Sequence, residues 1–344
     1  MGSGESDIIP KMTLQQNNRE TEEFASDVAR CLASKNKCLS PKYLYDPIGS
    51  QIFEKICLQP EYYLTRTEAS ILNRYAPVIS KLADNNIEII ELGSGSSYKT
   101  AILLRRLSLL KKKRIFYFPI DISSSILMES RRKLESQFPN VRIIGIRSDY
   151  DTGIDRAASE CMTIEKSNNN NNTPYTKLVL FLGSSIGNFE LIEARSLLLS
   201  VREKLRADDL LLIGFDLQKD ESLLKAAYND KAGMTAKFNL NLLARINREL
   251  GGNFKLEKFK HCAFYHRELH RIEMHLVSRT NQQVHIGALD RTFALKKGES
   301  IHTENSYKYS FDDIAELAED CGFVVEKNFT DKKRWFDLAL LSPS

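Results

Sequence analysis

The sequence predicts a doubly wound α/β domain, a mostly parallel β-sheet with helices on both faces. Between about residues 67 and 217, short apolar runs rich in β-branched residues alternate with amphipathic segments. The runs are apolar at consecutive positions, which is typical of strands buried on both faces of a parallel sheet. The same alternation of apolar runs and amphipathic segments returns at about 309–344. We therefore expect both stretches to share one sheet, with ligands bound beyond the carboxyl ends of its strands.

The expected elements follow the chain in the alternating order that such a sheet requires. Helices are expected from about Thr67 onward and at 100–110, 123–138 and 190–205. Strands are expected at 86–93, 114–123, 140–150, 177–183 and 208–217. A helix and two strands within 310–330 and 335–342 are expected to close the domain.

The remaining residues, 21–66 and 218–308, lack this alternation and are expected to form a second, smaller α+β lobe. The segment ETEEFASDVARCLASK indicates an amphipathic helix, because Phe24, Val28 and Leu32 recur every four residues. The later interval mixes a helical segment, TAKFNLNLLARINREL, with the strand-like pieces RIEMHLVSR and QVHIGALDRTFAL.

Composition excludes several classes of protein. A net charge of +4, from 49 basic and 45 acidic residues, is too balanced to indicate a polyanionic partner. The basic run LKKKR at 110–114 is expected to be a solvated loop, so we do not expect the protein to bind nucleic acid. No run of 18 apolar residues indicates a membrane span, and no apolar stretch of a signal peptide opens the chain.

Two polar segments and the cysteines add further expectations. Residues 1–20 are expected to be a disordered arm, and the asparagine-rich stretch at 167–174 a disordered surface loop. The six cysteines lack the CxxC spacing of metal clusters, which favours reduced thiols in a cytoplasmic protein. His261, His266, His270 and His275 have no HExxH spacing, so no metal is expected.

The stretch ELGSGSSYKT, residues 91–100, is a glycine-rich turn after a predicted strand. A phosphate-binding loop or a dinucleotide fingerprint would each need a glycine where Tyr98 stands. A turn without any ligand is the plain alternative. An acid before the turn, Glu91, and a second acid at the end of the next strand, Asp121, instead suit S-adenosylmethionine, which has no pyrophosphate. Asp121 lies 28 residues after Gly93, where a carboxylate can accept from both ribose hydroxyls.

The ends of two further strands support this interpretation. The third predicted strand ends in Asp149-Tyr150, which would accept from the adenine amino group and cover its ring. The fourth ends in GSSIGN, next to the position expected for the sulfonium. Four strand ends in the right order predict a methyltransferase.

Several longer segments extend this prediction to a particular family. YDPIGSQIFEKICLQPEYYLTRTEA, ELGSGSSYKT, FLGSSIGN, AYND, RIEM and TENSYKYS occur in this order over about residues 40–342. Together they resemble the histidine Nα-methyltransferases of ergothioneine biosynthesis. The resemblance implies a Rossmann-like class I methyltransferase domain, here 67–217 plus 309–344. It also implies a substrate-binding lobe built from 21–66 and 218–308, with S-adenosylmethionine as the cofactor.

The resemblance also implies roles for individual residues. The cofactor would be held by Tyr62, Gly93, Ser94, Lys99, Asp121, Asp149 and Tyr150. The substrate would be held by Tyr45, Phe53, Tyr62, Gly183, Asn188, Tyr228, Met274, Glu304 and Ser306. Within this set, Asn188 and Tyr228 would bind the substrate carboxylate, and Glu304 and Ser306 the imidazole. The expected catalytic residues are Asn188, Tyr228 and Tyr45. One departure is Ser185, where the family pattern has threonine.

The expected reaction is trimethylation of the α-amino group of L-histidine to hercynine, by a monomer acting on a small molecule. Two alternatives stay open at this point. The substrate is another amino acid, such as a tryptophan derivative, or the chain is a non-catalytic sensor of S-adenosylmethionine. A separate alternative is that Glu304 and Ser306 are ordinary surface residues. Tyr62 and Tyr63 also fit a core, and their alternation favours Tyr63 as the core residue.

Overall fold

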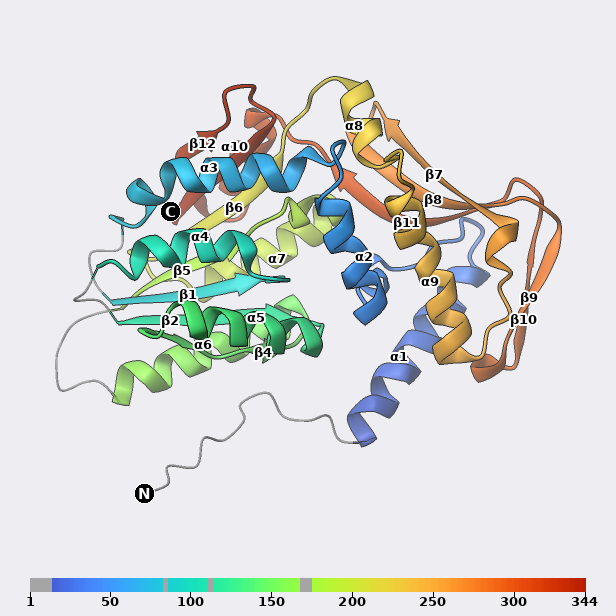
Figure 1. Cartoon of the computed structure of the whole chain (residues 1–344), viewed down its shortest axis with the longest axis horizontal. Helices are drawn as coiled ribbons and strands as arrows, with labels where there is room; N and C mark the ends of the chain where they lie inside the picture. The colour runs from blue at the N-terminus through green and yellow to red at the C-terminus, as the bar shows by residue number, and fades with distance from the viewer. Residues whose placement is uncertain (1–13, 83–85, 111–113, 168–174) are drawn as a thin grey trace. The chain divides into compact units, whose positions relative to one another are not determined.

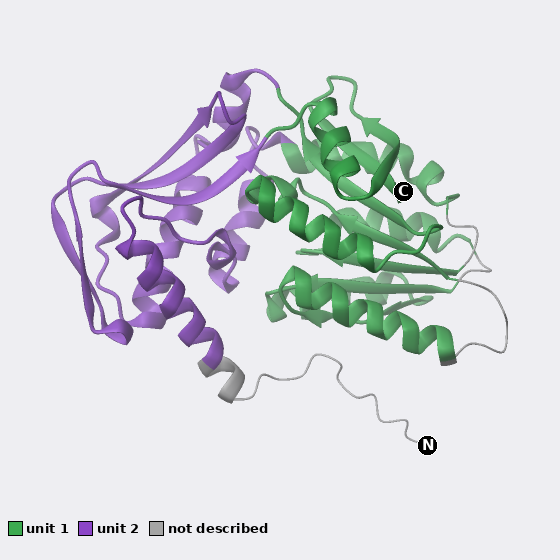
Figure 2. Cartoon of the chain, turned by 180° about the vertical axis from the view of Figure 1, so that it is seen from behind, with its two compact units in different colours: residues 1–10, 64–218, 308–344 green, residues 11–63, 219–307 purple. Residues whose placement is uncertain are grey.

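The computed structural model describes residues 14–82, 86–110, 114–167 and 175–344. These residues form two compact units (Figure 2). Unit 1 contains Leu64–Gln218 and Lys308–Ser344, and unit 2 contains residues 14–63 and Lys219–Tyr307. The expectations for residues 1–13, for the lysines at 111–113 and for the asparagine-rich stretch at 168–174 lie outside the described residues. Among the helices of the described chain, none is long and apolar enough to cross a membrane.

Unit 1 is built on an eight-stranded sheet of the described residues, with the order β12-β13-β6-β5-β1-β2-β3 and β4 also paired with β2. Strands β6, β5, β1, β2, β3 and β4 run parallel, whereas β13 is antiparallel to both of its neighbours. The strands are β1 (Asn86–Leu92), β2 (Ile115–Asp121), β3 (Val141–Ile143), β4 (Ile146–Arg147), β5 (Tyr175–Phe181), β6 (Leu210–Asp216), β12 (Phe323–Thr330) and β13 (Phe336–Pro343). Nearly every residue of the central strands is buried, and the prediction of a doubly wound α/β sheet is confirmed.

Helices lie on both faces of this sheet (Figure 1). They are α3 (Tyr63–Ile79), α4 (Tyr98–Leu107), α5 (Ser124–Gln137), α6 (Tyr150–Ser167), α7 (Leu191–Glu203) and α10 (Phe311–Asp320). Helix α3 begins at Tyr63, earlier than the expected start at Thr67. Residues 63–66 contain neither glycine nor proline, so nothing in the sequence stops the helix from extending toward the break at Pro60.

The third strand and the helix after it differ from the prediction. The expected strand at 140–150 is two short strands, β3 and β4, and Tyr150 is instead the first residue of α6. The sequence-based assignment omitted α6 altogether. Its buried residues Ile154, Ala157 and Cys161 lie three and four positions apart, which is a helical stripe. Apart from Ile154, this short stripe consists of small side chains, so its periodicity is weak in the sequence.

Unit 2 combines helices with two small antiparallel sheets. Its helices are α1 (Leu14–Ala33), α2 (Pro47–Cys57), α8 (Glu221–Ala227) and α9 (Met234–Leu250). One sheet has the order β11-β8-β7 and the other pairs β9 with β10. The strands are β7 (Phe259–His266), β8 (Arg271–Ser278), β9 (Gln282–Ile286), β10 (Arg291–Leu295) and β11 (Ser300–Tyr307). Residues 14–20, expected in the disordered arm, form the first turns of α1, where no glycine or proline interrupts the helix.

A β-bulge in β11 determines which side chains share a face of the three-stranded sheet. His302 pairs with His275, but Glu304 pairs with Met274, so the register shifts between His302 and Glu304. Residues two apart normally lie on the same face of a strand. The extra residue, Thr303, therefore puts His302 and Glu304 on opposite faces.

Helix α9 covers the face of this sheet that carries Met274. It packs against β7, β8 and α2, and it buries Phe238, Leu242 and Ile246. The side-chain amide of Asn239 in α9 lies 3.0 Å from Nδ1 of His261, whose neighbour in β8 is Leu276. Leu276 and Met274 are two residues apart in β8 and so share this face.

A buried ion pair joins the end of β6 to the segment that leads into α10 within unit 1. Asp216 Oδ2 lies 2.8 Å from Lys308 Nζ, and both side chains are fully buried. The backbone N–H of Tyr309 also donates to the carbonyl of Asp216 at 3.0 Å. Removing one member of a buried pair leaves an uncompensated charge, which is much more costly than losing the attraction itself.

We expect Lys308→Met to lower the free energy of unfolding by about 3–5 kcal/mol, because the buried Asp216 carboxylate loses the ammonium group of its ion pair. Urea denaturation measures this change. The matched control is Lys332→Met, at an exposed position, with an expected effect within about 0.5 kcal/mol of zero. Equal stability of the two variants would contradict the assigned role of the buried pair.

Candidate active site

The glycine-rich turn after β1 has a left-handed backbone that makes room for a neighbouring tyrosine. Gly93 has φ +67° and Gly95 φ +49°. A Cβ atom on Gly93 would lie 2.9 Å from the hydroxyl oxygen of Tyr150. Gly93 therefore meets two requirements at once, a positive φ and the close approach of the Tyr150 side chain.

Glu91, the acid that precedes this turn, is buried and anchors the start of α4. Thr100 Oγ1 donates to Glu91 Oε1 at 2.6 Å, and the Tyr117 hydroxyl donates to Glu91 Oε2. Ser97 Oγ lies 2.9 Å from the same tyrosine hydroxyl. Burial raises the pKa of Glu91 to about 7, against the opposing effect of the hydrogen bonds from Thr100 and Tyr117. Both carboxylate oxygens of Glu91 therefore accept from protein side chains, which gives this acid a structural role that does not depend on a ligand.

Asp121, the last residue of β2, holds the turn directly. Gly95 N donates to Asp121 Oδ2 and Ser123 N donates to Asp121 Oδ1, both at 2.9 Å. Burial raises the pKa of Asp121, although these backbone donors act in the opposite direction. Each carboxylate oxygen has two lone pairs, so acceptor capacity remains for the hydroxyls of a ribose. Ser94, next to the turn, is also buried, and its hydroxyl has no hydrogen-bond partner among the described residues. The carboxylate acceptor and the neighbouring hydroxyl together fit the ribose of a nucleoside.

Asp149 and Tyr150 lie at the start of α6. Asp149 is exposed, and its Oδ1 accepts from the backbone N–H of Thr152 at 2.8 Å, so it caps this helix. The Tyr150 ring packs against Phe181 and Phe189, with centroid distances of 5.4 and 5.9 Å. Burial raises the pKa of Tyr150, which keeps its hydroxyl protonated.

A buried carboxylate that the sequence analysis missed, Glu68 of α3, connects two of the predicted site residues. Glu68 Oε2 lies 2.6 Å from Lys99 Nζ, and Glu68 Oε1 accepts from Gly183 N at 2.8 Å. The Glu68 side chain is fully buried, and that of Lys99 is 21% exposed. Gly183 has φ +84°, and a Cβ atom there would lie 3.0 Å from Lys99 Nζ. No motif marks Glu68, because its partners are far away in the sequence.

The turn after β5 carries Asn188 on a short 3-10 helix, Ser185–Asn188. The Ser184 hydroxyl accepts from Asp216 N at 2.9 Å, which ties this turn to the end of β6. Ser185, the residue that departs from the family pattern, donates to the carbonyl of Leu182 at 3.0 Å. A threonine hydroxyl could make the same bond, so the departure leaves this contact available. Asn188 itself is half-buried.

In unit 2 the predicted substrate residues form one aromatic cluster. The ring centroids of Tyr45 and Phe53 are 5.5 Å apart, those of Phe53 and Tyr62 6.1 Å, and those of Tyr62 and Tyr228 6.2 Å. The Tyr228 hydroxyl lies 2.6 Å from Ser306 Oγ. Residues from α2, from the segment before α3, from the end of α8 and from β11 thus meet within this unit.

Glu304 lies on the same sheet face as Ser306 and Met274 and is only 6% exposed. Burial is the main cause that raises the pKa of Tyr62 well above its usual value, and electrostatic interactions with neighbours that include Tyr228 and Glu304 add to it. Tyr62 therefore stays protonated. Tyr63 is buried as well, but its hydroxyl instead accepts from Lys219 Nζ at 2.9 Å.

His261 supports the backbone of this cluster through two hydrogen-bond contacts. Its Nδ1 lies 3.0 Å from Asn239 Nδ2, and its Nε2 lies 2.9 Å from the backbone carbonyl of Tyr228. Burial lowers the pKa of His261, which favours the neutral ring that these two contacts require. The ring therefore fixes the backbone at Tyr228. The histidine spacings in the sequence gave no indication of this role.

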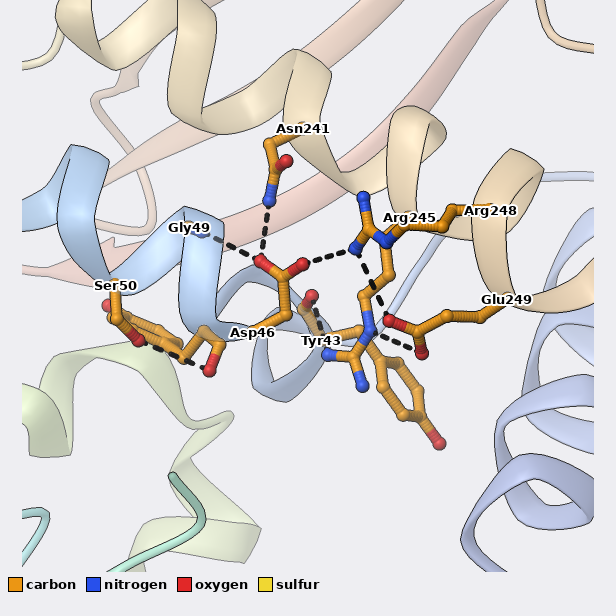
Figure 3. A network of polar contacts seen from close by, with 9 residues as sticks. Tyr43, Asp46, Gly49, Ser50, Asn241, Arg245, Arg248 and Glu249 are labelled. Carbon is orange, nitrogen blue, oxygen red and sulfur yellow. Dashed lines mark hydrogen bonds and ion pairs between the residues drawn. The ribbon is translucent and has the colours of Figure 1, made fainter. Parts of the chain in front are cut away.

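A network of polar contacts fixes the residue that follows Tyr45 (Figure 3). Asp46 caps α2, with Oδ1 accepting from Gly49 N and from Asn241 Nδ2, both at 2.7 Å. Arg248 forms an ion pair with Asp46 Oδ2, and the aspartate side chain is 1% exposed. The partners of Asp46 in α9 lie about 195 and 202 residues further along the chain, so no local sequence pattern indicates them.

Two features define a class I S-adenosylmethionine-dependent methyltransferase. One is the sheet order with its antiparallel strand β13 beside β6, and the other is the glycine turn after β1, which Asp121 at the end of β2 holds. More specifically, residues 24–343 match the family model described as histidine-specific, S-adenosylmethionine-dependent methyltransferases. The chain belongs to this family, as the resemblance in the sequence predicted.

Individual relatives agree with this assignment. The chain is 36% identical to the histidine N-alpha-methyltransferase of Mycolicibacterium smegmatis, covering 93% of this chain and 94% of that protein. It is 37% identical to the enzyme of the same name from Mycobacterium tuberculosis, covering 91% and 93% of the two chains. Ergothioneine biosynthesis protein 1 of Neurospora crassa is 32% identical over 83% of this chain, which spans 31% of that protein.

We expect Glu68→Gln to lower the free energy of unfolding by about 1.5–3 kcal/mol, the range for a hydrogen bond to a charged group. Lys99 and the Gly183 turn would lose their common anchor, so affinity for S-adenosylhomocysteine should also fall. Denaturation and calorimetric titration measure the two effects. The control is Glu129→Gln, at an exposed position of α5, which should change neither. An unchanged affinity in Glu68→Gln would show that the anchor does not matter for the cofactor.

Proposed function

We propose that the protein transfers three methyl groups from S-adenosylmethionine to the α-amino nitrogen of L-histidine and so forms hercynine. The observation that carries the substrate assignment is the pair Glu304 and Ser306. The two side chains are buried, share one face of β11 and adjoin the tyrosines of the aromatic cluster. Family membership supports the same reaction.

The proposal gives each unit a different task. The residues expected to hold the cofactor belong to unit 1, apart from Tyr62. Those expected to hold the amino acid belong to unit 2, apart from Gly183 and Asn188. In this account Asp121 accepts from the ribose hydroxyls, and Asn188 and Tyr228 bind the substrate carboxylate as hydrogen-bond donors. Tyr45 and Tyr62 line the imidazole site, with Phe53 and Met274 as its apolar walls.

S-adenosylmethionine supplies a methyl group that is activated by a positively charged sulfur. The chain itself must align the amine lone pair with that group and exclude water. The amine must be neutral, and a desolvated site favours its neutral form over the ammonium ion. Tyr62 keeps its own proton, so its hydroxyl is suited to donate a hydrogen bond rather than to act as a resting base. After three transfers the nitrogen has no lone pair, so the reaction stops.

Imidazole recognition follows from the chemistry of Glu304 and Ser306. A carboxylate accepts from an imidazole N–H, and a hydroxyl can donate to or accept from the second ring nitrogen. A hydrogen bond with a charged partner contributes about 1.5–3 kcal/mol. A ligand that leaves buried polar groups unpaired can be rejected by roughly 10⁴–10⁵-fold. This favours imidazole over indole, which offers a single donor and no acceptor nitrogen.

A non-catalytic sensor of S-adenosylmethionine is the second candidate from a different class. It would need the Asp121 turn but no amino-acid site. The buried Tyr228–Ser306 contact and the adjacent Glu304 favour the enzyme, because a sensor has no use for this polar group in an aromatic cluster. The expectations of a monomer and of a cytoplasmic protein, the latter based on the dispersed cysteines, remain part of the proposal.

We expect Glu304→Ala to reduce kcat/KM for histidine by roughly 10-fold to 150-fold, which corresponds to the loss of about 1.5–3 kcal/mol. The affinity for S-adenosylhomocysteine should stay within about twofold, because Asp121 and its turn belong to unit 1. Steady-state kinetics and isothermal titration measure the two quantities. The matched control is Glu268→Ala, at an exposed position of unit 2, which should leave both unchanged.

Comparing the loss of histidine turnover with the loss of S-adenosylhomocysteine affinity tests whether Glu304 binds the substrate. If Glu304→Ala weakens the cofactor as much as it slows histidine turnover, Glu304 supports the fold rather than the substrate. If histidine turnover is unchanged, the imidazole is recognised by other residues.

A further inference from the structure

Three potential metal ligands lie together on the face of the β11-β8-β7 sheet opposite Met274. Glu273 and His275 are two residues apart in β8, so they point to the same side. His302 of β11 is the direct cross-strand partner of His275, and the two ring centroids are 5.0 Å apart. One ligand atom from each of the three residues lies within 4.8 Å of the others.

Two ring nitrogens in this cluster are buried and have no hydrogen-bond partner among the described residues. They are Nδ1 of His275 and Nε2 of His302. Buried polar atoms without partners are unfavourable and rare, so each needs an explanation. The remaining nitrogen of His275, Nε2, lies 3.0 Å from Glu273 Oε2.

The carboxylate of Glu273 is held by an arginine on one side only. Arg271 Nε lies 2.9 Å and Nη2 2.7 Å from Glu273 Oε1, which leaves Oε2 toward the two rings. Phe264 stacks on the His275 ring at a centroid distance of 5.2 Å and an interplanar angle of 17°. The carboxylate and the ring are therefore both oriented before any ligand arrives.

We propose that Glu273, His275 and His302 form a binding site for one divalent transition-metal ion of the zinc type. Two imidazoles and one carboxylate are a common ligand set for zinc with one open coordination position. Tetrahedral zinc with ligands at about 2.0–2.2 Å needs ligand atoms roughly 3.3 Å apart. The three ligand atoms now lie within 4.8 Å of one another, so binding of the ion would require the side chains to move closer together.

The bulge at Thr303 connects this site with the proposed imidazole contact. Thr303 Oγ1 donates to the Met274 carbonyl at 3.0 Å, between His302 on one face and Glu304 on the other. An ion bound to His302 would restrict the movement of β11 next to the bulge. Methyl transfer needs no metal, so the inference is independent of the proposed function and concerns the opposite face of the sheet.

The test uses full-length, tag-free protein that has been treated with a chelator and then titrated with ZnCl₂ by calorimetry. Wild type should bind one ion per chain with a dissociation constant in the micromolar range or below. His302→Ala should weaken binding at least about tenfold, and so should the nearly isosteric Glu273→Gln. The control is His285→Ala, an exposed histidine in β9, which should bind like wild type. Titration with S-adenosylhomocysteine checks that unit 1 of each variant is folded.

A second readout reports the ligands directly. Co²⁺ in the same site should give the visible absorption bands of a four-coordinate ion in wild type and His285→Ala, and these bands should be lost in His302→Ala. Absence of zinc binding by the wild-type protein would overturn the proposal. Equal zinc affinity of wild type, His302→Ala and Glu273→Gln would overturn it as well, because the ion would then bind elsewhere.

Discussion

The buried carboxylate of Glu68 is the interaction on which the arrangement of unit 1 depends most. A charge without solvent must be compensated by nearby donors, and here these are the Lys99 ammonium and the Gly183 backbone. The donors belong to α4 and to the turn after β5, which follow two adjacent strands of the sheet. One side chain of α3 therefore fixes the relative positions of two segments that we assign to the cofactor and the substrate. Glu91 likewise fixes the start of α4 by accepting a hydrogen bond from Thr100. Asp121 fixes the turn at Gly95 by accepting from its backbone N–H.

Unit 2 uses buried charge in a similar way, but its strands add a further constraint. Asp46 is held by Asn241 and Arg248 of α9, and this fixes the chain next to Tyr45. The bulge at Thr303 then decides which face each residue of β11 occupies. If Thr303 paired with Met274 in a regular ladder, Glu304 would lie opposite Glu273, on the same face as His302 and away from Met274. The proposed imidazole contact thus depends on the register of a strand and on more than residue identity.

The parts of this architecture that could be predicted from the sequence are those encoded by local patterns. The apolar strands, the Gly93 turn and the acid Asp121 are each visible within a few residues. Helix α6 was missed because its stripe of small residues is weak, and the third strand was drawn too long because β3 and β4 are interrupted. Glu68, His261 and the pairing of His275 with His302 depend on contacts between residues far apart in the sequence. No spacing along the chain indicates them.

The central claim is that the chain trimethylates the α-amino group of histidine. The most direct test is mass spectrometry after incubating the pure protein with S-adenosylmethionine and an equimolar mixture of the twenty amino acids. The account predicts that histidine alone gains three methyl groups, with monomethylated and dimethylated forms as intermediates. Methylation of tryptophan or another amino acid instead would contradict the roles assigned to Glu304 and Ser306. Binding of the cofactor without methylation of any of the twenty would contradict the proposed reaction and favour the sensor.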